Sequence, residues 1–251
     1  MSKEVQKNFS RKTEMDIYEQ EIKYKGYICG GKPQVTETAK KITETYGYKQ
    51  TKSDNESLYL IVGTVPSISG LYEGFYYMSD GNAFYTILDK TLGIKDYERS
   101  FCKLKEEYVK RDNKKEIGEE IEDRLNDYHI VLFDTLEYCL RINSYDSGII
   151  QYKLHSRKDF LKILKQNKMT VILTSSEATK YFKEIFDEFK DIRIPVYKNT
   201  SNSKGIMPLN AKTKEGYEVE LIQAASPSFS HTKNNETKIN DIAKIYKRII
   251  K

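Results

Sequence analysis

The sequence has no tryptophan, only three histidines and three cysteines, and no long apolar run. Cys29, Cys102 and Cys139 show neither Cys-x-x-Cys nor Cys-x-x-His spacing, so we expect no zinc or iron–sulfur site and no other metal. Scattered thiols are typical of a reducing compartment, which favours a cytoplasmic protein. No apolar run approaches the ~20 residues that a membrane span needs. The charged N-terminal segment lacks the apolar stretch of a signal peptide.

The composition is that of a globular protein with a packed core. Hydrophobic residues make up 38% of the 251 residues and charged residues 31%, and this length fits one large domain. The formal net charge of +5 permits a polyanionic partner without requiring one.

Four short apolar runs, each bounded by turn or cap signals, occur along the chain. Runs of this kind predict strands that are buried on both faces, and helical patterns lie between them. The alternation favours an α/β fold with three αβα layers around a central, mainly parallel four-stranded sheet. In such a sheet, ligands bind at the carboxyl ends of the strands. The predicted strands are Leu58–Val62, His129–Phe133, Thr170–Leu173 and Val219–Ile222.

We divide the chain into an N-terminal extension, residues 1–55, and an α/β domain, residues 56–251. The extension is predicted to be helical, because one set of apolar residues has the spacing of an amphipathic helix. These residues are Val35, Ala39, Ile42 and Tyr46.

The segment from about residue 95 to residue 127 is dense in charges of both signs. We interpret it as an insertion or a helix pair with a solvated surface, because a run of charges is usually solvated. The alternative is that its basic residues contact DNA. Those residues are Lys110, Arg111, Lys114 and Lys115.

Distinctive loops follow the predicted strands. The first is Gly63-Thr-Val-Pro-Ser-Ile-Ser-Gly70, and an aromatic segment leads from it to Asn82-Ala-Phe-Tyr85. The second strand leads into Asp134, and Ser144-Tyr-Asp-Ser-Gly-Ile149 follows. The last strand leads into Ala224-Ala-Ser-Pro-Ser228.

In this order, these segments resemble the motifs of the uracil-DNA glycosylase superfamily, and most closely those of its hypoxanthine-DNA glycosylase branch. The first loop is similar to the Gly-Ser-Met-Pro-Ser loop of that branch, and the last is similar to its final Ser-Pro loop. The resemblance covers about Leu58 to Ile250. It implies the fold described above and a monofunctional DNA glycosylase without a cofactor. Such an enzyme flips an altered base out of the stack and hydrolyses its N-glycosidic bond, which leaves an abasic site.

The resemblance implies that the first loop approaches the flipped base closely, whereas an ordinary strand-to-loop turn is the alternative. Tyr77 matches the residue on which the base stacks, and the alternative is a core tyrosine. Ser67 is expected to contact DNA. The base-binding residues of the loop are then Gly63, Thr64, Val65 and Pro66.

Val65 departs from the superfamily pattern, because other members carry Asp or Asn at this position to activate water. The hypoxanthine branch also lacks that residue, and the resemblance assigns its role to the Asn of the aromatic segment. In this chain that residue is Asn82, whose carbonyl oxygen could orient a water as the catalytic group. The alternative is that Asn82 caps a helix that starts near Ala83.

Asp134 stands where uracil-reading members place an Asn. An ionised Asp only accepts hydrogen bonds, so it favours a base with an N–H donor, unless it acts while protonated. This argues against plain uracil as the best substrate. The alternative is that Asp134 caps a helix from Thr135. Asp146 and Ser147 either line the pocket or form only an Asx turn.

The final loop also departs from the pattern, because Ala224 stands where the uracil enzymes carry a catalytic His. His231 either contacts phosphate or solvent or replaces that imidazole. Phe229 is either a wedge for the vacated stack or a buried anchor, and the serines are expected to clamp phosphate. The predicted DNA contacts are Ser226, Pro227, Ser228, Phe229 and His231.

The leading prediction is therefore a monomeric DNA glycosylase for hypoxanthine or another deaminated base, with DNA as its partner and no membrane association. Val65, Asp134 and Ala224 differ from the residues that uracil enzymes carry at these positions, which indicates a pocket for a base other than uracil. An alternative is therefore a glycosylase that acts in defence on hypermodified bases of phage DNA. A catalytically inactive nucleic-acid-binding protein on the same fold is the rival from another class. A nucleotide- or small-molecule-binding α/β domain is the third hypothesis.

Overall fold

The computed structural model describes most of the chain from residue 40 onward and three short segments before it. No helix among the described residues is long and apolar enough to cross a membrane. The described ranges are 19–22, 28–29, 32–33, 40–53, 56–67, 70, 73–79, 82–110, 113–141, 146–164, 168–197, 207–227 and 235–250.

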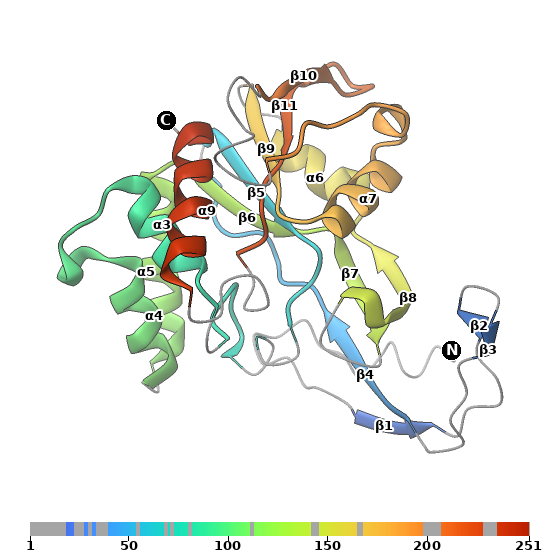
Figure 1. The fold of residues 1–251 in the computed structure, drawn as a ribbon, viewed down its shortest axis with the longest axis horizontal. Coiled ribbons are helices and arrows are strands. Elements are labelled where there is room, and N and C mark those ends of the chain that lie inside the picture. Colours follow the sequence, from blue (N-terminus) through green and yellow to red (C-terminus); the bar gives the residue numbers. More distant parts are fainter. Residues whose placement is uncertain are drawn as a thin grey trace.

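A sheet with the strand order β10-β11-β9-β5-β6 lies at the centre of the described structure (Figure 1). Its strands are β5 (Tyr59–Gly63), β6 (Ile130–Asp134), β9 (Met169–Leu173), β10 (Leu209–Lys212) and β11 (Glu218–Gln223). β11, β9, β5 and β6 are parallel, and β10 pairs antiparallel with β11 at the edge. The four predicted strands and their parallel arrangement are confirmed, whereas β10 was not predicted.

The central strands are buried on both faces, because successive side chains of a strand point to opposite sides of the sheet. In β5, Tyr59 and Ile61 pack into one core, and Leu60 and Val62 pack into the other. Helices cover both faces, which completes the predicted three αβα layers (Figure 1). The first core is closed by α3 (Phe84–Leu92), α4 (Phe101–Lys110), α5 (Lys114–Asp127) and α9 (Glu236–Ile249), and the second by α6 (Arg157–Leu164) and α7 (Ser176–Ile185).

A second, antiparallel sheet adjoins this domain, and its strand order is β1-β4-β7-β8. It consists of β1 (Glu19–Ile22), β4 (Lys40–Tyr46), β7 (Leu136–Arg141) and β8 (Ile149–Leu154), and a separate short hairpin joins β2 (Ile28–Cys29) to β3 (Lys32–Pro33). The predicted helix is therefore wrong for Ile42 and Tyr46, which lie on β4, while Val35 and Ala39 lie outside the described residues. Residues spaced for a helix also fit a strand here, because Thr43 and Thr45 are β-branched and β4 gains a partner strand in β7. The helix considered from Thr135 is likewise absent, since β7 begins at Leu136.

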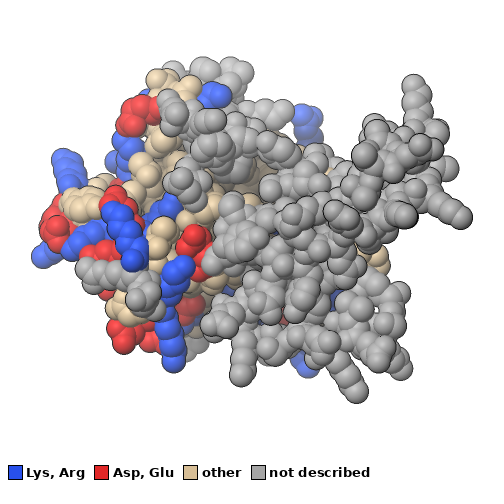
Figure 2. All heavy atoms as spheres, turned by 90° about the horizontal axis from the view of Figure 1, so that it is seen from below, with Lys and Arg blue, Asp and Glu red and all other residues tan. Residues whose placement is uncertain are grey.

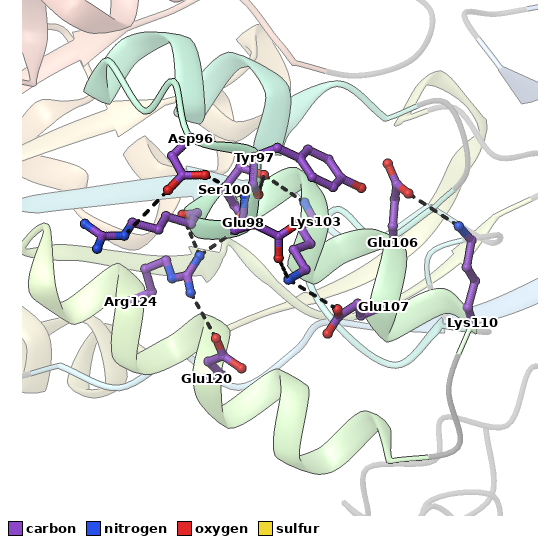
Figure 3. A network of polar contacts seen from close by, with 11 residues as sticks. Asp96, Tyr97, Glu98, Ser100, Lys103, Glu106, Glu107, Lys110, Glu120 and Arg124 are labelled. Carbon is purple, nitrogen blue, oxygen red and sulfur yellow. Dashed lines mark hydrogen bonds and ion pairs between the residues drawn. The ribbon is translucent and has the colours of Figure 1, made fainter.

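The charged segment forms the helix pair α4 and α5, as one of its two interpretations predicted. Most of its large apolar side chains are buried, with Tyr97 and Val109 as exposed exceptions, and many of its charges form ion pairs on the surface (Figure 3). Lys110 Nζ lies 3.3 Å from a carboxylate oxygen of Glu106, and Lys114 Nζ lies 3.0 Å from a carboxylate oxygen of Glu73. Basic and acidic side chains alternate over this side of the molecule (Figure 2). Arg111 lies outside the described residues, and contact with DNA here stays untested.

Asp89 joins α3 to the start of α4. Its buried Oδ1 accepts the Phe101 N–H at 2.8 Å, and Oδ2 accepts the Cys102 N–H at 3.0 Å. We expect Asp89→Ala to lower the free energy of unfolding by about 1–2 kcal/mol, because helix α4 loses its cap. The control is Asp96→Ala, which removes an exposed cap from the short 3-10 helix η1 (Tyr97–Arg99) and should have a smaller effect. Urea titration measures both, and equal losses would contradict the prediction.

Candidate functional site

The parallel strands bring the predicted site loops to one edge of the sheet. Gly63, the last residue of β5, is paired with Asp134, the last residue of β6. Val62 is paired with Leu173 of β9, which is level with Gln223 of β11. The loops that follow these residues therefore start side by side, as expected for the carboxyl edge of a parallel sheet.

Asp134 is a buried acid at this edge, with 4% of its surface exposed. The Tyr48 N–H donates to its carboxyl group, while Oδ2 has no hydrogen-bond partner among the described residues. Gly63 lies against the other oxygen, because a Cβ at Gly63 would stand 2.4 Å from Oδ1. Burial, and next the charge of Asp146, raise the pKa of Asp134 to about 8, against the opposing effects of Tyr48 and Arg141. Asp134 is therefore mostly protonated at pH 7.

Tyr77 reaches across the ends of β5 and β9. Its backbone has φ 57°, a left-handed conformation that is uncommon for a residue with a side chain. Its ring stacks on Phe84, with centroids 4.1 Å apart and an interplanar angle of 22°. Its hydroxyl group hydrogen-bonds with Thr174, and burial followed by the charge of Asp134 raises its pKa. Tyr77 thus stays neutral beside Asp134, and stacking of a base on its ring remains a prediction.

Asn82 caps helix α3, because its Oδ1 accepts the Phe84 N–H at 2.9 Å. This is the structural alternative considered for Asn82. Lys105 Nζ donates to the Asn82 carbonyl at 2.8 Å and to the Ser79 carbonyl at 3.1 Å, which fixes the backbone before the helix. Phe84 also stacks on Tyr77, so the cap holds Asn82 close to the aromatic part of the site. Orientation of a water by Asn82 remains a prediction.

The first loop is held from the side of the second sheet. The Pro66 carbonyl accepts a hydrogen bond from Nη2 of Arg141 on β7. Val65 packs against a small cluster of buried side chains on β7 and α7, so its contribution here is apolar packing. Ser67 Oγ accepts the Gly70 N–H at 3.0 Å, so this hydroxyl closes the loop on itself.

Asp146 places a second carboxyl group next to the first loop. It opens the 3-10 helix η2 (Asp146–Gly148), and the Thr64 hydroxyl donates to it. Burial raises the pKa of Asp146, while Thr64 and the charge of Arg141 act in the opposite direction. The Ser147 side chain lies outside the described part. Within the described ranges, no group of three or more His, Cys, Asp or Glu side chains could hold a metal ion.

The final loop is described only at its start. Ala224 is buried, and its N–H donates to the Leu173 carbonyl at 2.9 Å, so it continues the alignment with β9. Ser226 is half-buried and Pro227 is buried. The other residues predicted to contact DNA lie outside the described residues: Ser228, Phe229 and His231.

Three residues of this site were missed by the sequence analysis. Thr174 directly follows β9, so the rule that ligands bind at the carboxyl ends of strands could have found it. Arg141 is a charge at the end of the β7 segment, which gives a weak signal. Tyr48 lies in the region assigned to the extension, and no local pattern singles it out.

No protein-family model matches the chain, and no curated protein matches it by sequence. Among solved structures, it is similar to the solution NMR structure of a "putative Uracil DNA glycosylase" from Methanosarcina acetivorans. The identity is 16% and the TM-score 0.49, and the match covers 82% of this chain and 98% of that chain. The residues of the chain itself must therefore carry a functional assignment.

The close approach of Gly63 and Asp134 can be tested by adding one methyl group. Gly63→Ala places a Cβ 2.4 Å from Asp134 Oδ1, so the carboxyl group or the strand end must shift. We expect the free energy of unfolding to fall by about 1–3 kcal/mol, as is usual for overpacking.

The matched control is Gly118→Ala in α5, where the new Cβ would meet its nearest atom at 3.5 Å, an ordinary contact. Helix propensity predicts a gain of about 0.5–1 kcal/mol for this variant. Urea unfolding measures both variants. If Gly118→Ala were as destabilising as Gly63→Ala, the steric explanation would be wrong.

Proposed function

We propose that this protein is a monofunctional DNA glycosylase that binds a flipped, deaminated base and hydrolyses its N-glycosidic bond. The observation that carries the proposal is the partnerless Oδ2 of Asp134, at the edge where the motif-bearing loops meet. A buried polar atom without a partner lowers stability. The unpaired Oδ2 of Asp134 is explained if a bound ligand supplies its hydrogen-bond partner.

The protonation state of Asp134 indicates the kind of base. A protonated carboxyl group donates from the oxygen that carries its proton. The Tyr48 N–H donates to one oxygen of Asp134, and this must be Oδ1, since Oδ2 has no hydrogen-bond partner. Oδ2 is therefore the oxygen that can carry the proton and donate it to a ligand. A donor at this point pairs with a carbonyl oxygen and opposes an amino group. Deaminated bases carry a carbonyl group in place of an amino group, and we propose hypoxanthine as the first substrate to test.

Two further side chains complete the proposed pocket. Tyr77, backed by Phe84, provides the stacking surface, and its unusual backbone conformation is of the kind found at functional sites. Asn82 orients the attacking water, using the hydrogen-bonding capacity that remains after it caps α3.

The rival function is a DNA-binding protein without catalytic activity. It is favoured by the packing of Val65 into an apolar cluster and by the engagement of Asn82 Oδ1 in a helix cap. The two functions differ in whether an abasic site forms.

Asn82→Ala separates catalysis from capping. We expect wild-type protein to convert hypoxanthine-containing DNA into alkali-sensitive abasic sites, and the variant to be about 10²–10⁴-fold slower, because the water loses its orienting group. The assay is a cleavage panel of uracil, hypoxanthine, xanthine, hydroxymethylcytosine and glucosylated cytosine in oligonucleotides. Cleavage of a modified cytosine alone would transfer the assignment to hypermodified DNA.

Asn235→Ala is the matched control, because Asn235 Oδ1 caps α9 by accepting the Lys238 N–H at 2.9 Å, and Asn235 is not among the predicted site residues. Each variant should lose about 1 kcal/mol of stability with its cap. Only Asn82→Ala should lose activity. No cleavage of any substrate by wild type, together with tight DNA binding, would establish the rival function.

The activity should also depend on the proton of Asp134. Because the protonated form binds the carbonyl group, the rate should fall as the pH rises through about 8, the pKa of this group. Asp134→Asn keeps a donor that does not titrate, so its rate should stay level through the same range, whereas Asp134→Leu should be inactive. An unchanged alkaline limb in Asp134→Asn would exclude Asp134 as its source.

The free energy of unfolding should also depend on the protonation of Asp134. An unfolded Asp titrates near a pKa of about 4, so the folded protein holds an extra proton between that pH and about 8. The free energy of unfolding of the wild type should therefore decline across this window as the pH rises. Asp134→Asn should lack this part of the decline, as urea titrations at a series of pH values would measure.

A further inference from the structure

The proposed reaction requires a group that the known superfamily position does not supply. When the N-glycosidic bond breaks, the sugar develops positive charge, which a nearby carboxylate stabilises. Val65 cannot do this, and Asn82 carries no charge. Asp146 is the acid beside the first loop that can take this role, which rests on the proposed function.

Asp146 lies against the residue that directly precedes Val65. Its carboxylate accepts a hydrogen bond from the Thr64 hydroxyl. Thr64 Oγ1 is also 3.2 Å from Ser175 Oγ, where either atom could be the donor. Since a hydroxyl group has one proton, Thr64 donates to Asp146 and therefore accepts from Ser175. This two-hydroxyl chain fixes the carboxylate at the loop between β5 and the aromatic segment.

The surroundings of Asp146 differ from those of Asp134 in one decisive way. The charge of Arg141 favours the ionised form of both acids, but Asp146 also accepts a hydrogen bond from the Thr64 hydroxyl, which favours its carboxylate further. Asp134 has one backbone donor, and the charge of Asp146 is itself the second cause of its raised pKa. Two neighbouring acids whose environments separate their protonation states can take different roles in one reaction.

The charged and titratable groups that face Asp146 come from several elements. Negative neighbours disfavour its ionised form, while the guanidinium group of Arg141 favours it. The groups are Arg141 and Cys139 on β7, Glu177 and Tyr181 on α7, Asp134 on β6, and Tyr77.

We propose that Asp146 is a further catalytic residue, which faces the sugar of the flipped nucleotide as a carboxylate while Asp134 binds the base. The water oxygen attacks C1′ of the sugar and forms the new C–O bond. The C1′–N bond breaks, and its electron pair leaves with the base. One proton of the water passes to the carboxylate of Asp146, and the departing base takes up a proton from solvent.

Asp146→Asn tests this role, because it keeps the shape of the side chain and removes its charge. We expect the single-turnover rate on the substrate that wild type cleaves to fall about 10²–10⁴-fold. The dissociation constant for DNA and the melting temperature should change little. The acid limb of the rate–pH profile should disappear, because no carboxylate remains to be protonated.

A second readout is specific to the pair of acids. Without the charge of Asp146, the pKa of Asp134 should fall, and the alkaline limb of the residual activity should move to lower pH. A residue that only supports the fold would not move this limb. The control is Glu177→Gln, which removes a neighbouring charge on α7 and should leave the rate close to that of wild type.

Thr64→Val covers the case in which Asp146→Asn does not fold. Loss of the Thr64 hydroxyl should raise the pKa of Asp146 and move the acid limb to higher pH. Wild-type cleavage together with an equally active Asp146→Asn, or with an unmoved acid limb in Thr64→Val, would overturn the role of Asp146 alone. No cleavage by wild type would overturn the proposed function, and this role with it.

Discussion

Arg141 is a fully buried arginine, and the architecture of the site depends on what surrounds its charge. Burying a guanidinium group is strongly unfavourable unless hydrogen bonds and opposite charges compensate it. Nε donates to Thr45 Oγ1 on β4 at 2.8 Å, Nη2 donates to the Pro66 carbonyl in the first loop, and Asp146 and Asp134 lie close enough to interact with its charge. One side chain thus joins the second sheet, the first loop and both acids. The second sheet is therefore part of the site's support, although none of its strands belongs to the central sheet.

The same burial gives the two acids unequal properties. Both lose solvation at the sheet edge, and this loss is the largest cause that raises the pKa of each. The charge of Arg141 favours the anion of both acids, and the Thr64 hydroxyl stabilises that of Asp146 further. Asp134 has the Tyr48 N–H as its donor and also experiences the charge of Asp146. A like charge nearby favours the protonated form. A second negative charge in this cluster is therefore opposed by both burial and repulsion.

The sequence predicted those parts of the structure that local patterns determine. The four central strands are short apolar runs, and their parallel order places Gly63 beside Asp134 without further information. The second sheet was missed, because the apolar spacing before residue 47 fits a helix and a strand equally well, and only pairing with β7 decides between them. The sequence also identified Asp134 but left its charge open. That charge depends on burial, on Tyr48 and on Asp146, and none of these is a local property of the chain.

Ala224 supplies no imidazole to stabilise the negative charge that the departing base gains. Ala224 is buried, and its N–H is engaged with Leu173, so this residue cannot help. In the proposed reaction, the charge develops on the carbonyl oxygen that Asp134 binds. A fixed donor interacts more strongly with an oxygen as its charge grows, which favours the transition state over the bound substrate. The proton that selects a carbonyl-bearing base would then also promote its departure, so a base without that oxygen loses both binding and catalysis. A neutral acid can replace an imidazole here only because the site keeps it protonated.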